Sequence, residues 1–334
     1  MALALEVRRD DLAAARVADG EPVSLEEGQA RFAVERFGLT ANNVTYGVLG
    51  DRLRYWTFFP SGTEGWGRVP SWGFATAVAS RCADVAEGAR IFGYVPMGGE
   101  LVLTPRDVGE RGLYDGSDHR AELPTAYNGY RFAQPSDRDD VTMVLQPLFV
   151  TSVLLARSLE GASRVIFSSA SSKTALGTAF LLARRGIETA GITASTDFAA
   201  GLGVYDEIVG YDAIDELEPS VATFVDLAGN AEVRAAVHRH FGADLQASVL
   251  VGATHVDAAP PTPDPLPGPK PTLFFAPDHV ADGIDTGALG ELVEWSAGWL
   301  EIKRRDGPGA VLAAWIEAVR GNLPPTRGLS LALH

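Results

Sequence analysis

Cysteine and positive charge are scarce in this 334-residue chain, and each scarcity excludes a class of function. The single cysteine, Cys82, excludes a disulfide within the chain and a cysteine-rich zinc site. Lysine and arginine total 28 against 43 aspartate and glutamate residues, which gives a formal net charge of -15. Because a nucleic-acid backbone requires clustered cations, we expect no nucleic-acid partner. The six histidines show no HExxH pattern, so we expect no metal site.

Long apolar runs are also missing. No run reaches the roughly 18 residues that a membrane span needs. The N-terminal stretch MALALEVRRDDLAAARV becomes charged early and lacks the apolar region of a secretory signal. We therefore expect a cytoplasmic protein with no membrane partner. Its composition, 46% hydrophobic and 21% charged residues, is that of a globular chain long enough for two domains.

The middle of the chain alternates between apolar runs and stretches of helical periodicity. The apolar runs lie at 164–169, 187–194, 205–212, 221–229, 247–254 and 272–277. Strands that alternate with helices predict βαβ units and a parallel sheet. Residues 260–271 contain seven prolines, which exclude a central strand or helix and predict a stiff surface crossing.

The flanking parts of the sequence have a different pattern. Residues 1–140 contain short aromatic and β-branched pieces between Gly/Pro turns, which predicts a β-rich, barrel-like domain. Residues 141–160 form an apolar helical connector that Pro147 should kink or restart. From about residue 285 the pieces ELVEWSAGWLEIKRR and AVLAAWIEAVRG predict helices, and LSLAL predicts a short final strand.

The stretch VIFSSASSKTALG combines a strand, a turn of small residues and a helix. A parallel strand that ends at Ser168 delivers the turn to the carboxyl edge of the sheet, where α/β folds bind ligands. The unpaired N–H groups and the dipole of the following helix favour an anion. Hydroxyl and ammonium groups here could hold phosphate, and the candidates are Ser169, Ser171, Ser172, Lys173 and Thr174. The alternative is a serine-rich cap before an ordinary helix.

The ends of three later runs add candidates for the same cofactor. The second run ends in GITAST, with no acid before Asp197. Dinucleotide sites for a free ribose hydroxyl place Asp or Glu at this position, so its absence favours NADP over NAD and makes Ser195 a candidate. Alternatively, no adenine ribose binds there. Asp226 closes the fourth run and His255 follows the fifth, so we expect both at the cofactor cleft.

Several of these motifs resemble the medium-chain dehydrogenase/reductase superfamily. The resemblance covers most of the chain, and the stretches that carry it are FGLTANNVTYGVLG (around 38–51, matched to a strand), WGRVPSWGFATAVASRCADVAEGARIFGY, VIFSSASSKTALGTAFLLARRG and GITASTDFAAGLGVYDEIVGYD. The strings SSASSKTA, LPTAYNGY, DLAGN, VGATH and FFAP are similar to a bacterial branch described as a domain of unknown function.

The resemblance implies an α/β fold of two domains. One is a GroES-like, β-rich catalytic domain over residues 1–140 and 285–334, and the other is a doubly wound Rossmann dinucleotide-binding domain over 141–284. The family's Gly-His-Glu zinc motif and four-cysteine lobe are missing, which implies a place among the zinc-independent quinone and enoyl-thioester reductases. Ser169, Ser172 and Ala175 stand near positions where the superfamily prefers glycine.

The resemblance also implies an activity. Its zinc-independent members reduce an activated C=C bond of a small-molecule substrate by hydride transfer from NADP(H), so the chain is expected to be an NADP-dependent oxidoreductase. A homodimer is compatible with this expectation. Two other functions stay open: a non-catalytic nucleotide-binding protein, and a redox-neutral lyase or isomerase on the same fold.

Candidate catalytic residues follow from the same resemblance. Asn43 matches an asparagine of the superfamily pattern, and Tyr46 lies where the pattern often has Asp. Tyr55 lies near a tyrosine of the enoyl-thioester reductases. A tyrosine hydroxyl can donate a hydrogen bond to an enolate oxygen or act as an acid. Alternatively, Tyr46 is a barrel tyrosine whose hydroxyl reaches solvent.

Residues 114–130 are rich in polar and aromatic groups and supply further candidates. His119 could act as acid or base, and Arg120 could hold a carboxylate or phosphate of the substrate. Tyr127 and Tyr130 could form walls of the substrate pocket, together with Asn128. The alternative is a solvated loop with aromatic anchors.

Overall fold

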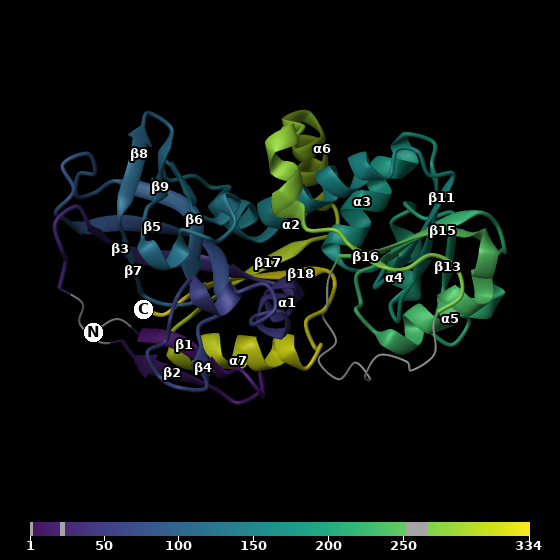
Figure 1. Cartoon of the computed structure of the whole chain (residues 1–334), viewed down its shortest axis with the longest axis horizontal. Coiled ribbons are helices and arrows are strands. Elements are labelled where there is room, and N and C mark those ends of the chain that lie inside the picture. The colour runs from purple at the N-terminus through teal and green to yellow at the C-terminus, as the bar shows by residue number, and fades with distance from the viewer. Residues whose placement is uncertain (1–2, 21–23, 252–265) are drawn as a thin grey trace. The chain divides into compact units, whose positions relative to one another are not determined.

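The computed structural model describes residues 3–20, 24–251 and 266–334, and the chain divides into two compact units. Unit 1 comprises residues 1–146 and 299–334, and unit 2 comprises residues 147–298 (Figure 1). Unit 2 ends at 298 rather than 284, because helix α6 (Thr286–Ser296) packs within it. Leu292 of α6 is fully buried, and Trp295 stacks on Phe180 with ring centroids 4.7 Å apart.

Unit 1 is β-rich, as the sequence of residues 1–140 predicts, and contains two β-sheets. A nine-stranded sheet runs in the order β17-β18-β3-β5-β6-β10-β9-β8, with β7 beside β3, and a smaller sheet runs β2-β1-β4. The strands are β1 (Leu3–Arg8), β2 (Ala15–Asp19), β3 (Ala30–Leu39), β4 (Trp66–Gly67), β5 (Pro70–Ser80), β6 (Arg90–Pro96), β7 (Glu100–Leu103), β8 (Pro105–Gly109), β9 (Gly112–Asp115), β10 (Gly129–Phe132), β17 (Glu301–Asp306) and β18 (Arg327–Ala332). The helical segments are α1 (Ala41–Val48), η1 (Tyr55–Thr57), η2 (Asp118–Arg120), η3 (Thr125–Tyr127) and α7 (Pro308–Val319).

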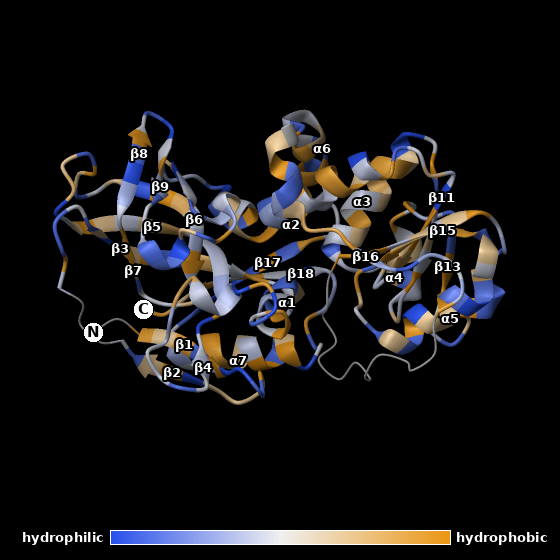
Figure 2. Ribbon diagram, viewed as in Figure 1, coloured by the Kyte–Doolittle hydropathy of each residue, from blue (hydrophilic) through white to orange (hydrophobic). Residues whose placement is uncertain are grey.

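Two predictions from the sequence are wrong. The stretch matched to a strand around 38–51 contains helix α1, because Thr40 and Asn43 cap it reciprocally through side chain and backbone. The predicted helix ELVEWSAGWLEIKRR ends at Ser296, and the following EIKRRD is strand β17. β17 pairs residue by residue with β18, so tertiary pairing outweighs helix propensity there, and Figure 2 shows it as mostly hydrophilic.

Unit 2 contains the predicted parallel sheet. Its order is β13-β12-β11-β14-β15-β16, and every neighbouring pair is parallel. Counted from β11, this is the 3-2-1-4-5-6 order of the Rossmann fold. The strands are β11 (Arg164–Ser168), β12 (Glu188–Ile192), β13 (Glu207–Val209), β14 (Ala222–Asp226), β15 (Leu245–Leu250) and β16 (Thr272–Leu273). The helical segments are α3 (Lys173–Arg184), α4 (Thr196–Gly201), η4 (Ile214–Glu216), α5 (Ala231–Phe241), η5 (Gly242–Asp244), η6 (Ala276–Asp282) and α6.

The strand order of this sheet reverses between β11 and β14. Both strands are buried along their whole length, as expected for central strands of a parallel sheet. Their carboxyl ends, Ser168 and Asp226, lie at the topological switch point, where open α/β sheets bind ligands. The fold therefore fixes the position at which a cofactor is expected.

Helix α2 (Asp139–Ser158) crosses the border between the two units as one element that continues through Pro147. Proline cannot donate to the carbonyl of Met143, one turn earlier. That carbonyl faces Gly38 in unit 1, where a Cβ atom would lie 2.7 Å from the Met143 oxygen. Gly38 thus permits the close approach of strand β3 to the first half of α2.

Candidate functional site

The turn between β11 and α3 is fixed tightly against strand β12. The Ala170 N–H donates to the Ile192 carbonyl at 3.1 Å, and the Tyr205 hydroxyl donates to the Ala170 carbonyl at 2.8 Å. Gly191 allows this approach, because a Cβ atom there would lie 2.8 Å from the Ala170 Cβ. The turn is therefore preorganised at the switch point of the sheet.

The serines of this turn keep the backbone shape that glycine usually provides. Ser169 has a φ of 50°, in the left-handed region that favours glycine. Ser172 is the N-cap of α3, and its hydroxyl accepts the Ala175 N–H at 3.3 Å. Ser171 receives a 2.9 Å hydrogen bond from the Thr193 hydroxyl. The residues predicted to bind phosphate thus lie together on one short segment. Their side chains offer hydroxyl groups at positions where glycine would offer only backbone N–H groups.

Lys173 is the first residue of α3 and only 8% exposed. Burial lowers the pKa of its ammonium to about 8. A buried cation at the N-terminus of a helix is unfavourable, because the helix dipole favours negative charge there. Thr174, half-buried, follows it in the first turn of α3. An anion bound at this turn would interact favourably with both the Lys173 ammonium and the helix dipole.

Asp226 lies at the switch point but is fully buried. Its carboxylate accepts the Ser168 hydroxyl at 2.7 Å and pairs with Arg234 at 2.9 Å. The Ser168 hydroxyl in turn accepts the N–H groups of Leu227 and Ala228, both at 3.0 Å. This network ties the ends of β11 and β14 together and gives Asp226 a positioning role. Its direct contact with a cofactor remains a prediction.

The end of β12 presents hydroxyl groups rather than a carboxylate. Ser195 is the half-buried N-cap residue of α4, and its N–H donates to the Thr193 hydroxyl at 3.1 Å. The first acid after the strand, Asp197, is exposed. His255, which the sequence also assigns to the cofactor cleft, lies outside the described residues.

Unit 1 gathers four buried tyrosines from separate elements. Tyr46 comes from α1, Tyr55 from η1, Tyr94 from β6 and Tyr127 from η3. The rings of Tyr46 and Tyr55 are 4.7 Å apart, those of Tyr94 and Tyr127 are stacked at 4.5 Å, and the hydroxyls of Tyr55 and Tyr127 lie 3.3 Å apart. Three of these residues are sequence-predicted. Tyr94 is missed, because strand β6 is buried at every position after Arg90 and its sequence does not single out one inward residue.

The four hydroxyl groups of this tyrosine cluster are held neutral. Burial raises the pKa of Tyr46, Tyr55, Tyr94 and Tyr127. The Tyr46 hydroxyl also interacts with Trp72, Asn42 and Tyr94, which offsets part of the effect of burial. Neutral hydroxyls in a water-poor cluster are suited to donate hydrogen bonds to an oxygen on which charge develops.

Asn43, a predicted catalytic residue, is buried and forms part of the α1 cap. Its side-chain oxygen accepts the Thr40 N–H at 2.9 Å, and its NH₂ group donates to the Pro70 carbonyl at 3.2 Å. Both ends of the amide are therefore engaged with backbone. Asn43 is placed to position α1, and with it Tyr46, while its catalytic role remains a prediction.

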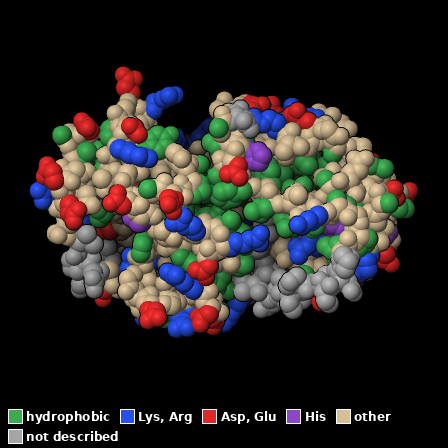
Figure 3. All heavy atoms as spheres, in the orientation of Figure 1, with side chains coloured by type: hydrophobic (Ala, Val, Ile, Leu, Met, Phe, Trp, Pro, Cys, Tyr) green, Lys and Arg blue, Asp and Glu red, His purple; other side chains and the backbone are tan. Residues whose placement is uncertain are grey.

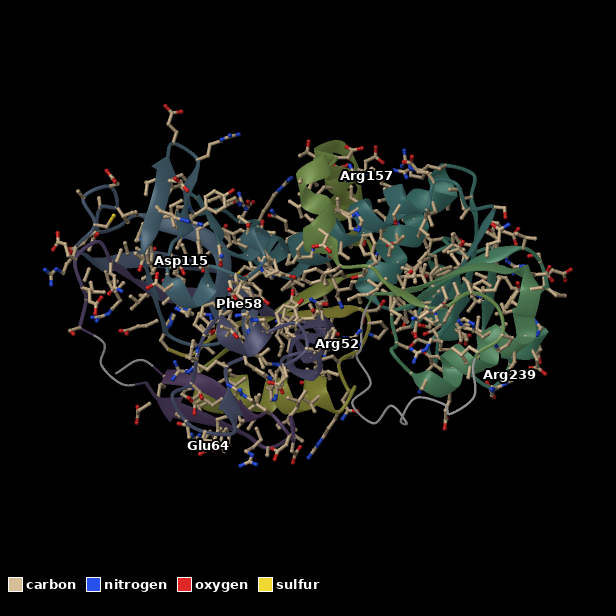
Figure 4. All side chains as sticks on the ribbon, viewed as in Figure 1. Arg52, Phe58, Glu64, Asp115, Arg157 and Arg239 are labelled. Carbon is tan, nitrogen blue, oxygen red and sulfur yellow. The ribbon has the colours of Figure 1, made fainter. Side chains whose placement is uncertain are left out.

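Arg120 is buried in an ion pair rather than open to a ligand. Its guanidinium lies 3.1 Å from Asp115 and donates to the Tyr130 hydroxyl at 2.9 Å and to the Phe58 carbonyl at 3.2 Å. Phe58 and Asp115 are labelled in Figure 4. His119 is exposed, with its Nε2 3.4 Å from the same Phe58 carbonyl. The predicted substrate roles of Arg120 and Tyr130 stay predictions, and their contacts give them a structural role.

Sequence reasoning also missed a charged groove of about 700 Å³ in unit 1. Arg90 lies over the Phe74 ring and pairs with Glu35 and Asp139, each at 2.8 Å. Burial opposes ionisation of Glu35, but hydrogen bonds from Arg90 and Thr76 outweigh it and lower the carboxyl pKa. The groove lining consists of Glu35, Arg36, Phe74, Thr76, Gly88, Ala89, Arg90, Phe132, Ala133, Gln134, Pro135, Asp139, Asp140, Met143 and Arg304.

Charge in the described part of the chain is dispersed. Lys, Arg, Asp and Glu side chains intermingle on the face shown in Figure 3. Among residues 3–20, 24–251 and 266–334, no three His, Cys, Asp or Glu side chains gather as ligands for a metal ion.

Comparisons with known proteins agree with this fold. A family model described as "Protein of unknown function (DUF2855)" matches residues 37–324. CurA from Vibrio vulnificus, which has also been crystallised with NADPH, is similar over 100% of this chain and 99% of its own, with a TM-score of 0.67 and 13% identity. No curated protein matches the sequence.

Two further solved structures have the same architecture. A quinone oxidoreductase from Coxiella burnetii is similar over 100% of both chains, with a TM-score of 0.60 and 11% identity. A mutant enoyl thioester reductase from Candida tropicalis is similar over 99% of both chains, with a TM-score of 0.56 and 9% identity. At these identities the likeness carries the fold, and it confirms the fold expected from the resemblance to the medium-chain dehydrogenase/reductase superfamily.

Proposed function

The chain belongs to the DUF2855 family, and we propose that it is an NADPH-dependent, zinc-independent reductase of an activated C=C bond in an α,β-unsaturated carbonyl, enoyl or quinone-like small molecule. The observation that carries the proposal is the turn at 169–173. It lies at the switch point of a Rossmann sheet and combines hydroxyl groups, a helix N-terminus and the buried Lys173.

The residues of the turn fit a dinucleotide phosphate. Hydroxyl groups of Ser171, Ser172 and Thr174 can donate to phosphate oxygens, and Lys173 supplies the positive charge. Ser195 and Thr196 lie where an adenine ribose is expected and carry no negative charge that would repel a 2′-phosphate. When bound, NADPH supplies the hydride.

The residues of unit 1 supply the remaining chemistry. In the proposed reaction the substrate gains two electrons and two hydrogens, one as hydride from NADPH and one as a proton from water or a tyrosine. The carbonyl oxygen next to the reduced bond gains negative charge in the transition state, and a neutral tyrosine hydroxyl stabilises it by donating a hydrogen bond. Tyr46 is assigned this donor and acid role, and Tyr55 lies beside it.

The first test is binding and oxidation of NADPH. Titration of protein fluorescence should show NADPH binding at sub-millimolar concentration, tighter than NADH. With duroquinone (tetramethyl-1,4-benzoquinone) or crotonyl-CoA as acceptor, oxidation of NADPH should be seen as a loss of absorbance at 340 nm. Absence of NADPH binding would exclude the reductase function. Binding of NADPH without its oxidation by either acceptor would favour a non-catalytic nucleotide-binding protein.

Replacing Lys173 with Ala should weaken NADPH binding by about 1–2 kcal/mol, which is roughly a 5- to 30-fold rise in Kd, because one charge-assisted phosphate contact is lost. The matched control is Lys303→Ala, at an exposed lysine of unit 1. An unchanged Kd in Lys173→Ala would exclude the phosphate contact.

The pH dependence of NADPH binding should follow the same lysine. Burial lowers the pKa of Lys173 from 10.5 to about 8, so the charged form that attracts phosphate predominates below pH 8. Affinity should therefore fall as the pH rises above 8. The unfolding free energy should rise from pH 8 toward 10.5, where the unfolded chain binds the additional proton. Titrations from pH 7 to 9.5 at fixed ionic strength should show this decline, and Lys173→Met should flatten it.

A further inference from the structure

Two hydrogen-bond donors, one in the tyrosine cluster and one on the neighbouring Trp72, are buried without an acceptor. Among the described residues, the hydroxyl of Tyr94 and the Nε1 of Trp72 have no hydrogen-bond partner. Tyr94 is fully buried on β6, and Trp72 is partly buried on β5. Burying an unsatisfied donor is unfavourable, so native proteins seldom leave one unless it has a use.

The two donors are held side by side by the sheet. Trp72 and Tyr94 are directly opposite in the antiparallel pairing of β5 and β6, so their side chains lie on the same face. Their ring centroids are 5.3 Å apart. The Tyr46 hydroxyl, from α1, lies near both side chains without forming a hydrogen bond that satisfies either donor. Three polar tips thus converge from rigid elements, and all three can donate a hydrogen bond.

The surroundings of these donors are flat and aromatic. Tyr127 stacks on Tyr94, and Phe58 meets the Tyr94 ring edge-on at 5.1 Å. The neighbouring cation, Arg120, is already engaged by Asp115 and Tyr130. A ligand carrying phosphate groups would find this guanidinium occupied, whereas a flat neutral ring with a carbonyl group would match both the donors and the rings.

We propose that Tyr94 and Trp72 together donate hydrogen bonds to a carbonyl oxygen of a flat, uncharged substrate of the quinone type. The assignment of the ligand class rests on the reductase function proposed above. In that reaction a quinone gains a hydride from NADPH and a proton from Tyr46, which is reprotonated by water, to give the hydroquinone and NADP⁺. Negative charge grows on the held oxygen as hydride arrives, and donors fixed on a sheet stabilise it without reorganisation.

The test is equilibrium dialysis with duroquinone in the absence of NADPH, on three variants. Duroquinone has no free ring position, so it does not alkylate Cys82. Tyr94→Phe should weaken its binding at least tenfold without lowering the thermal unfolding midpoint, because the lost hydroxyl has no partner in the free protein. Trp72→Phe should also weaken binding. Tyr114→Phe, at a tyrosine of the same unit that is 41% exposed, should change neither quantity.

Several results would overturn the proposal. These are no binding of duroquinone to the unaltered protein, full affinity in Tyr94→Phe, and a lowered unfolding midpoint in Tyr94→Phe, which would mean that the hydroxyl already has a partner. Binding of crotonyl-CoA that depends on Tyr94 while duroquinone binding does not would overturn the substrate class. If duroquinone binding depends on Tyr94 but NADPH is neither bound nor oxidised, the ligand site at Tyr94 and Trp72 is supported and the reductase function is excluded.

Discussion

Replacing Arg120 with Ala lowers the free energy of unfolding by about 3–5 kcal/mol, the expected cost of leaving one member of a buried ion pair alone. The side chains of Arg120 and Asp115 are 1% and 0% exposed. Without the guanidinium, the Asp115 carboxylate stays buried and the Tyr130 hydroxyl loses a donor. Urea unfolding followed by tryptophan fluorescence measures the loss.

An exposed pair in the same unit provides the control for this prediction. Arg54 lies 3.1 Å from Glu122, and both side chains are largely exposed, so Arg54→Ala should cost no more than about 1 kcal/mol. The double variant Arg120→Met with Asp115→Asn should recover part of the stability, because both charges disappear together. A cost below about 1 kcal/mol for Arg120→Ala would mean that the pair is solvated and free to bind a substrate.

Replacing Tyr46 with Phe should lower kcat about 100-fold while changing KM little, because general-acid catalysis contributes about 10²- to 10⁴-fold. Tyr46 is 6% exposed, and its hydroxyl interacts with Trp72, Asn42 and Tyr94. Loss of one hydroxyl leaves the aromatic packing with Tyr55 in place. Steady-state oxidation of NADPH with duroquinone measures the effect.

The control for Tyr46→Phe is Tyr114→Phe, which should retain the kcat of the unaltered enzyme. If the Tyr46→Phe variant instead raises KM and leaves kcat unchanged, Tyr46 contributes to ground-state binding only. Equal activity in both variants would transfer the acid role to another group, and Tyr55 is then the next residue to replace.

The sequence predicts the strands of unit 2 well because a buried parallel strand is apolar along its whole length. Strands β11 and β14 show this pattern. The switch point at Ser168 and Asp226 follows from the strand order of the sheet, and the hydrophobic periodicity of the sequence does not predict that order. Sequence reasoning placed Asp226 at this edge, but its bond to Ser168 depends on two strands 58 residues apart in the chain.

Unit 1 was harder to predict because its short elements depend on distant partners. The cap that Thr40 and Asn43 form was hidden by the resemblance to a strand. Strand β17 is hydrophilic and gains its conformation from β18. Tyr94 and Trp72 become a pair only through the register of β5 and β6, so neither residue alone indicates a site.

The order in which the strands of unit 1 are translated affects how this unit folds on the ribosome. Strand β18 lies between β17 and β3, and the buried Trp315 of α7 donates to the Leu12 carbonyl at 2.8 Å. These late elements are translated after all of unit 2. Unit 2 can therefore complete its sheet while β3 of unit 1 still lacks its partner β18 and keeps unpaired backbone groups along that edge. A nascent chain stalled before residue 327 is expected to expose that edge to chaperones.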